Sequence, residues 1–237
     1  MQQQPAPAKT PRPPMPQAPP EFQAEKIMKL DSEGAIALLK DASATEFQKS
    51  KASMRIAQVG TKEAVPALAA LLTDEKLSDY ARFGMVPIPD PSVDVALRDA
   101  LARTKGQQRL GVIASIGQRK DTAAVPVLSK YLYSTDAALA EAAAASLGQI
   151  GGPQAIAALK TALVKTKGPA RNAVAAAGLV AAEGLEAAGD RKGAVALYSA
   201  LSRQDLPKSI RIAAMHSTIK VETDLKRPRT PPPPRNQ

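Results

Sequence analysis

One apolar pattern returns six times along the chain at nearly constant spacing. Each copy places aliphatic residues at helical intervals, as in the stretch AVPVLSKYL that begins at Ala124. The copies begin at Gly34, Ala64, Val93, Ala124, Ala155 and Gly193. Their starts are separated by 30, 29, 31, 31 and 38 residues, and an insertion near residues 183–189 lengthens the last step. Such a period with two helices in each copy predicts an α-solenoid, because one helical hairpin cannot bury its apolar stripe without a neighbour on each side.

Residues 121–163 contain one complete copy and the start of the next. Apolar residues at helical spacing predict a first helix with Pro126 in its first turn, where the missing N–H leaves no bond unmade. This stripe consists of Ala124, Val125, Leu128, Tyr131 and Leu132. A second, alanine-rich helix is expected over residues 137–149, capped by Asp136. The run Gly151-Gly152-Pro153 then ends the copy and starts the next helix.

The pattern AVPxLxxxL, followed by a small-residue helix that ends in Ile-Gly, resembles HEAT repeats, in particular short bacterial repeats of the phycobilin-lyase type. The ending recurs at Val59-Gly60, Ile116-Gly117 and Ile150-Gly151. The resemblance covers about residues 31–220 and implies an all-α, right-handed solenoid of about six HEAT-like hairpins. Such solenoids serve many kinds of partner, so the resemblance is far more specific for fold than for function. Tetratricopeptide repeats fit less well because the chain has no Trp, and the Thr-Pro-Leu-His signature of ankyrin repeats is absent.

The prolines mark the expected ends of the solenoid. Eight of the 21 prolines lie in residues 1–20 and five in residues 228–234. Proline-rich segments favour extended, polyproline-II-like backbone over a packed fold. We therefore expect an N-terminal tail (1–20), a capping segment (21–30), the solenoid (31–221) and a basic C-terminal tail (222–237). In the capping segment, Phe22, Ile27 and Leu30 are expected to form a short helix over the first repeat, the alternative being a frayed linker.

The chain carries a net charge of +10, which permits an acidic partner. The turns 103–109 and 165–171 share a Thr-Lys-Gly core at an offset of two repeat steps, so we expect them on the same edge of the solenoid. The candidate partner-binding residues are Arg103, Lys105, Arg109, Lys165, Lys167 and Arg171 in these turns, and Lys226, Arg227, Arg229 and Arg235 in the C-terminal tail. The competing interpretation is local: cations complement helix C-termini, glycine stops the helix, and the tail is merely solvated.

The sequence offers no catalytic or metal-binding set. It has no cysteine, which excludes disulfides and thiolate metal sites, and His216 is its only histidine. Asp90, Asp94 and Asp99 cluster after a proline-rich stretch at residues 87–91, where we expect a rigid bend with Tyr80, Arg82 and Phe83 nearby. Asp90 is interpreted as a turn or capping residue. We therefore expect no cofactor and no enzyme activity.

These features favour a non-enzymatic scaffold or accessory subunit that binds protein partners, with an acidic surface, through the solenoid and the tails. One alternative is that the basic edge binds nucleic acid or another polyanion, although an aromatic content of 3% argues against base stacking. Another alternative is a bilin-lyase-like accessory protein that acts on a tetrapyrrole-bearing partner. No apolar run suits a membrane span or a signal peptide, so a chain that starts as written is expected in the cytoplasm, or in the periplasm if an upstream signal was removed.

Overall fold

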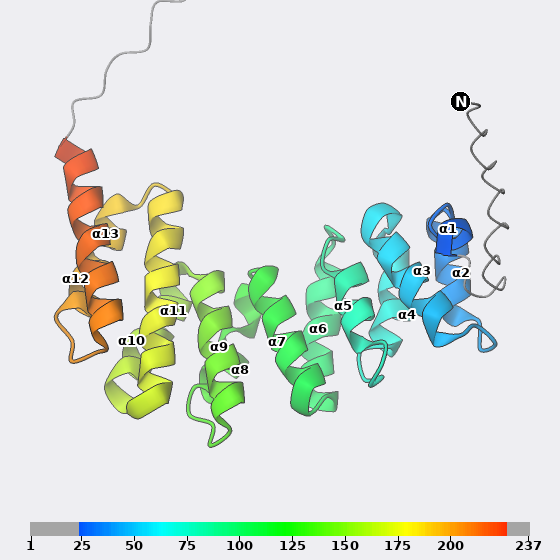
Figure 1. The fold of residues 1–237 in the computed structure, drawn as a ribbon, viewed down its shortest axis with the longest axis horizontal. Helices are drawn as coiled ribbons and strands as arrows, with labels where there is room; N and C mark the ends of the chain where they lie inside the picture. Colours follow the sequence, from blue (N-terminus) through cyan, green and yellow to red (C-terminus); the bar gives the residue numbers. More distant parts are fainter. Residues whose placement is uncertain (1–23, 227–237) are drawn as a thin grey trace, which may run out of the picture.

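The computed structural model describes residues 24–226, and their regular structure consists of helices. After α1 (Ala24–Ile27), the described helices pair into six hairpins, each with an A helix and a B helix. The A helices are α2 (Ser32–Lys40), α4 (Val65–Ala70), α6 (Pro91–Arg103), α8 (Val125–Tyr131), α10 (Gly152–Lys165) and α12 (Arg191–Ser202). The B helices are α3 (Glu46–Val59), α5 (Ser78–Met85), α7 (Gly106–Gln118), α9 (Ala137–Ile150), α11 (Gly168–Ala187) and α13 (Lys208–Lys226). The 3-10 turns η2 (Lys62–Ala64) and η3 (Thr122–Ala124) precede α4 and α8. Figure 1 shows the hairpins side by side in one elongated row, which confirms the all-α solenoid.

Each repeat buries an alanine or valine in the first turn of its A helix or just before that helix and, four positions later, a large residue. These pairs are Ala35 with Leu39, Ala64 with Leu68, Val93 with Leu97, Ala124 with Leu128, Ala155 with Leu159, and Ala194 with Tyr198. The first and last copies therefore begin at Ala35 and Ala194, one residue after Gly34 and Gly193, where the sequence alignment placed their starts. Both glycines instead lie in the first turn, where their N–H groups donate to the capping carboxylates of Asp31 and Asp190.

The B helices of successive repeats approach one another closely because the residues between them are small. A Cβ on Gly84 would lie 2.6 Å from the carbonyl oxygen of Ser53, and one on Gly148 would lie 2.7 Å from that of Ala177. Gly117 likewise faces the backbone of the next B helix. These glycines recur at steps of 33 and 31 residues. The recurrent B-helix glycine is therefore inside the helix, and the Ile-Gly alignment that equated Ile116-Gly117 with Ile150-Gly151 was wrong by three residues.

The two ends of the solenoid differ. At the N-terminal end, Ile27 is buried in the main core and the Arg55 guanidinium donates to the carbonyl of Leu30 at 2.6 Å, which ties the segment after α1 to α3. At the C-terminal end, α13 continues to Lys226, so residues 222–226 are helical. The insertion near residues 183–189 lengthens α11 to 20 residues. Phe22 and most of the expected tails, residues 1–23 and 227–237, lie outside the described residues.

Candidate interaction surfaces

The two basic turns have the same backbone. Thr104 and Thr166 are buried, and each hydroxyl donates to the carbonyl four residues earlier, at 2.8 and 2.7 Å. Gly106 and Gly168 follow with φ values of 50° and 55°, a conformation that favours glycine. The geometry of the turn therefore accounts for the repeated threonine and glycine without any partner.

The cations in these turns divide into two groups. Arg103 and Lys165 are the last residues of α6 and α10, where a positive charge complements the helix dipole. Lys105 and Lys167 are the N-cap residues of α7 and α11 and make no capping hydrogen bond. Because the N-terminus of a helix carries partial positive charge, a lysine there gains nothing from the dipole. Local stability thus explains the first pair of cations and leaves the exposed second pair unexplained.

The two arginines that follow are more enclosed. The guanidinium of Arg171 donates to the carbonyls of Leu163 at 3.1 Å and Asp205 at 2.7 Å, and to the side-chain oxygen of Gln204 at 3.1 Å. Arg171 therefore joins repeat five to the loop of repeat six. The equivalent Arg109 is partly buried, and its Nε finds no hydrogen-bond partner within residues 24–226.

The remaining candidates lie at the C-terminal end. Lys226 is the last residue of α13. Arg227, Arg229 and Arg235 lie outside the described residues. Their role in partner binding stays a prediction.

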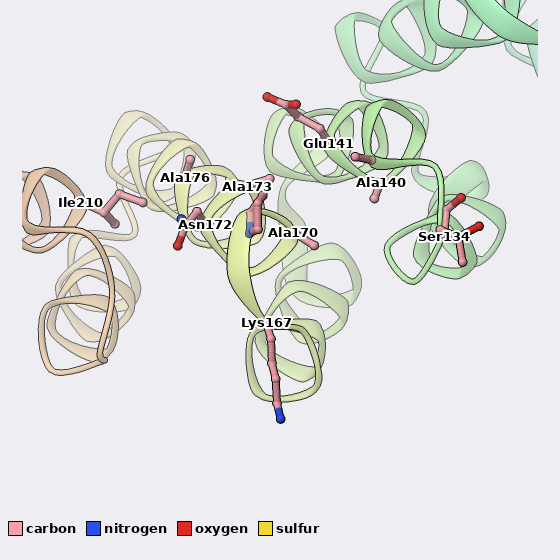
Figure 2. Close-up of a pocket in the computed structure, with 12 residues that line it drawn as sticks. Ser134, Ala140, Glu141, Lys167, Ala170, Asn172, Ala173, Ala176 and Ile210 are labelled. Atoms are coloured by element: carbon pink, nitrogen blue, oxygen red, sulfur yellow. The ribbon is translucent and has the colours of Figure 1, made fainter.

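A groove of about 590 Å³ opens between α9, α11 and the start of α13. Its lining residues are Ser134, Thr135, Ala137, Ala140, Glu141, Lys167, Pro169, Ala170, Asn172, Ala173, Ala176 and Ile210. Figure 2 shows Ile210 on one side and Ala140 and Ser134 on the other, with Lys167 at the edge and its side chain directed away from the alanines. The groove exists because alanines leave the space between neighbouring helices unfilled. Its surface combines an apolar floor with one cation and one carboxylate at the rim.

The sequence pointed to only one residue of this groove, Lys167. The others escaped notice because residues from 134 to 210, contributed by three repeats, form the lining together. The alanine content at the start of two successive B helices is the sequence signal that could have indicated the groove.

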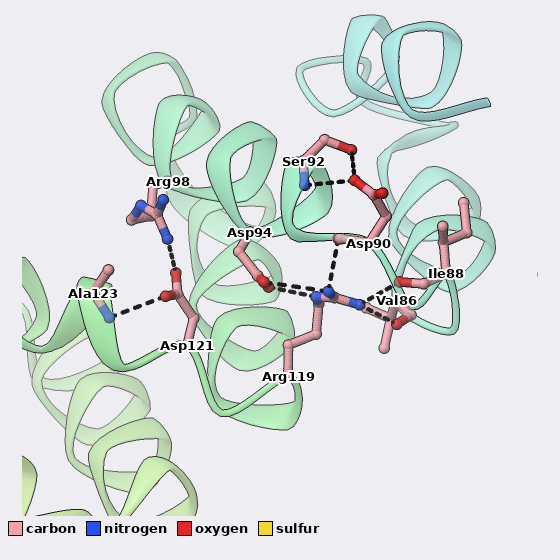
Figure 3. Close-up of polar contacts among 9 residues, drawn as sticks. All are labelled: Val86, Ile88, Asp90, Ser92, Asp94, Arg98, Arg119, Asp121 and Ala123. Atoms are coloured by element: carbon pink, nitrogen blue, oxygen red, sulfur yellow. Dashed lines mark hydrogen bonds and ion pairs between the residues drawn. The ribbon is translucent and has the colours of Figure 1, made fainter. Parts of the chain in front are cut away.

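The carboxylates next to the proline-rich bend make ion pairs and hydrogen bonds that hold the fold (Figure 3). Arg119 pairs with both carboxylate oxygens of Asp94 and donates to the carbonyls of Val86, Ile88 and Asp90 at 2.8, 2.8 and 3.1 Å. These bonds fix the turn that follows α5. The sequence predicted the bend but did not identify the arginine that holds it.

Asp90 is the N-cap of α6, as expected. The hydroxyl of Ser92 donates to the Asp90 carboxylate at 2.6 Å, and the backbone N–H of Ser92 donates to the same carboxylate at 2.9 Å. These bonds, the hydroxyl first, hold the pKa of Asp90 below its usual range. Asp99 and His216 are exposed on different helices. Among residues 24–226, no group of three or more His, Asp or Glu side chains is placed to hold a metal ion.

Residues 95–179 match the family model for HEAT repeats. The matched segment runs from within α6 to within α11 and contains both Thr-Lys-Gly turns and most of the groove. No curated protein matches the chain. In the described part of the chain, none of the helices has the length and apolar character needed to cross a membrane. Residues 95–179 are thus similar to HEAT repeats, and the helical hairpins on either side of this segment continue the same architecture.

Proposed function

We propose that the chain is a non-enzymatic scaffold that binds a protein partner at the groove between α9, α11 and α13. HEAT repeats commonly act as protein-interaction scaffolds, and a groove lined by alanines accepts bulky apolar side chains from another protein. The observation that carries the proposal is the groove together with an exposed Lys167 that neither the turn geometry nor the helix dipole explains.

The charge at the rim suggests the chemistry of the partner. Lys105 and Lys167 occupy equivalent turns two repeats apart, and both are exposed. An acidic segment that lies along this edge would meet both lysines, and complementary charge would speed the encounter. The proposed partner is therefore a protein that presents apolar side chains to the groove and carboxylates to the edge.

Two pairs of variants test the groove and the edge separately. Ala176→Trp fills the groove, and Ala145→Trp adds the same bulk to an exposed position on α9 outside it. Lys167→Glu reverses charge at the rim, and Lys130→Glu does so on the exposed surface of α8. Proteins recovered with each full-length variant from native lysate are compared quantitatively with those recovered by the wild-type chain.

A protein whose recovery falls with Ala176→Trp and Lys167→Glu but not with the two control variants supports the proposal. Equal recovery with all four variants shows that the groove is not the binding surface. If the bound material is nucleic acid, is removed by nuclease and falls steeply with salt, the basic edge binds a polyanion instead, because each phosphate contact releases counterions.

A further inference from the structure

Exposed aromatic rings on α5 have no role in the core. The chain contains only three Phe and four Tyr, so aromatic side chains are scarce. Tyr80 and Phe83 nevertheless lie one turn apart on α5 with exposed fractions of 41% and 57%. Pro87 is also exposed, in the turn that follows α5. Large rings that remain in water although alanine and leucine fill the core indicate a contact surface.

A pocket of about 330 Å³ lies beside Phe83, between α5 and α7. Its lining residues are Asp79, Arg82, Phe83, Val86, Pro87, Ser115 and Gln118. The guanidinium of Arg82 forms one wall: it pairs with Asp79 and donates to the carbonyl of Gly111 at 3.2 Å. A Cβ on Gly111 would lie 2.3 Å from the guanidinium carbon, so a larger residue there would displace the Arg82 side chain from this position. The wall is thus built by two repeats and does not depend on surface side chains alone.

The chemistry of this pocket suits a polyproline-II segment. Pyrrolidine rings pack against aromatic and proline side chains such as Phe83 and Pro87, and the carbonyls of a polyproline-II backbone make no internal hydrogen bonds. Gln118 is exposed at the rim and can donate to such a carbonyl. Asp79, whose side chain is 82% exposed, places a carboxylate where a basic residue of the ligand can pair.

The first 20 residues of the same chain have this composition. They contain eight prolines, Lys9 and Arg12, and no acidic residue. We propose that the pocket between α5 and α7 binds this proline-rich segment, residues 1–20, of its own chain. The segment would then cover Phe83 and set its basic residues against Asp79.

The length of chain favours the N-terminal segment over the C-terminal one. Polyproline II rises about 3.1 Å per residue, so 20 residues extend over roughly 60 Å. The described chain begins at α1, which packs against α3, and α3 packs against α5. At the usual spacing of packed helices, α5 therefore lies about two spacings, roughly 20 Å, from α1. The 11 residues after Lys226 span only about 34 Å and start at the sixth repeat, four repeats from α5.

The absence of cysteine allows a direct test in the full-length protein. A single cysteine is introduced as Ala18→Cys and carries a nitroxide spin label, and the loss of NMR signal is mapped over the isotope-labelled solenoid. Signals of α5 and α7 around Phe83 should lose most of their intensity, whereas those of α9 to α13 should keep theirs. Loss confined to α1 and α2, or spread evenly over the chain, overturns the proposal.

Variants on both sides of the contact give the controls. Phe83→Ala should restore the signals of α7, and Val164→Ala, which shortens an apolar side chain that is 84% exposed on α10, should not. Pro13→Ala with Pro14→Ala changes only the segment, so it leaves the solenoid intact and should also restore the signals. If Phe83→Ala or the double proline variant folds but does not restore the signals of α7, the segment does not bind in this pocket. A mixture of spin-labelled chains and isotope-labelled chains without spin label should show no loss, and a loss in that mixture assigns the segment to a second copy and overturns binding within one chain.

Discussion

Replacing Gly148 with alanine tests the close approach of α9 and α11, and Gly184 provides a matched control. Alanine is a better helix former than glycine by about 0.5–1 kcal/mol at an interior position. At Gly184 in α11, an added Cβ would meet no heavy atom within 4 Å. Gly184→Ala should therefore raise the free energy of unfolding by about 0.5–1 kcal/mol.

The same substitution at Gly148 should have the opposite sign. Its Cβ would lie 2.7 Å from the carbonyl oxygen of Ala177 and 3.1 Å from the Ala177 Cα. Both atoms belong to the backbone of a packed helix, so the clash is relieved only if α9 and α11 move apart. Overpacking of this kind costs about 1–3 kcal/mol, which exceeds or cancels the gain in helix propensity. We expect Gly148→Ala to lower the free energy of unfolding by about 1–2 kcal/mol.

Urea unfolding followed by circular dichroism at 222 nm measures both variants, and hydrogen exchange localises the change. Exchange is informative because repeats in a solenoid can unfold separately. Gly148→Ala should speed amide exchange in α9 and α11 while leaving α2 and α3 unchanged. If Gly148→Ala stabilises the protein as much as Gly184→Ala does, the two helices are not as close as the structure places them and the reasoning fails.

Three further variants probe other contacts. Arg119→Met should lower the free energy of unfolding in urea by about 3–5 kcal/mol, because it leaves the Asp94 carboxylate and three carbonyls without their donor. Arg119→Lys should lower it by less. If Arg119→Met costs no more than an ordinary surface substitution, the role assigned to Arg119 is contradicted. Leu128→Ala, at a fully buried position, should cost about 2–5 kcal/mol by the same measurement, and a neutral result would mean that the buried stripe of α8 is misassigned. Arg171→Met should speed hydrogen exchange in residues 203–207 and at the start of α13, and Lys165→Met should not; equal exchange in both variants would refute the link between repeats five and six.

The fold could be predicted because the evidence for it is local and repeated. A buried residue every three or four positions defines each A helix, and six copies at nearly one period define the solenoid. The register of the B helices was harder because glycine follows isoleucine for two unrelated reasons. Gly117, in the last turn of α7, permits a close approach to α9, whereas Gly151 follows the end of a helix with a φ of 62°. The sequence identified Gly151 as a helix end from the following Gly152-Pro153, but nothing local to Gly117 shows that it faces another helix.

The candidate site was harder to predict than the fold, because residues at equivalent positions of the two basic turns recur for different physical reasons. Thr166 and Gly168 recur because the turn requires a buried hydroxyl and a positive φ. Arg171 recurs in sequence, yet two of its three hydrogen bonds go to residues 204 and 205 of the next repeat. Only Lys167 and its counterpart Lys105 are left with no structural reason to be basic. Periodicity in one sequence finds all of these positions, but only the contacts of each side chain separate a cation that holds the fold from one that remains available to a partner.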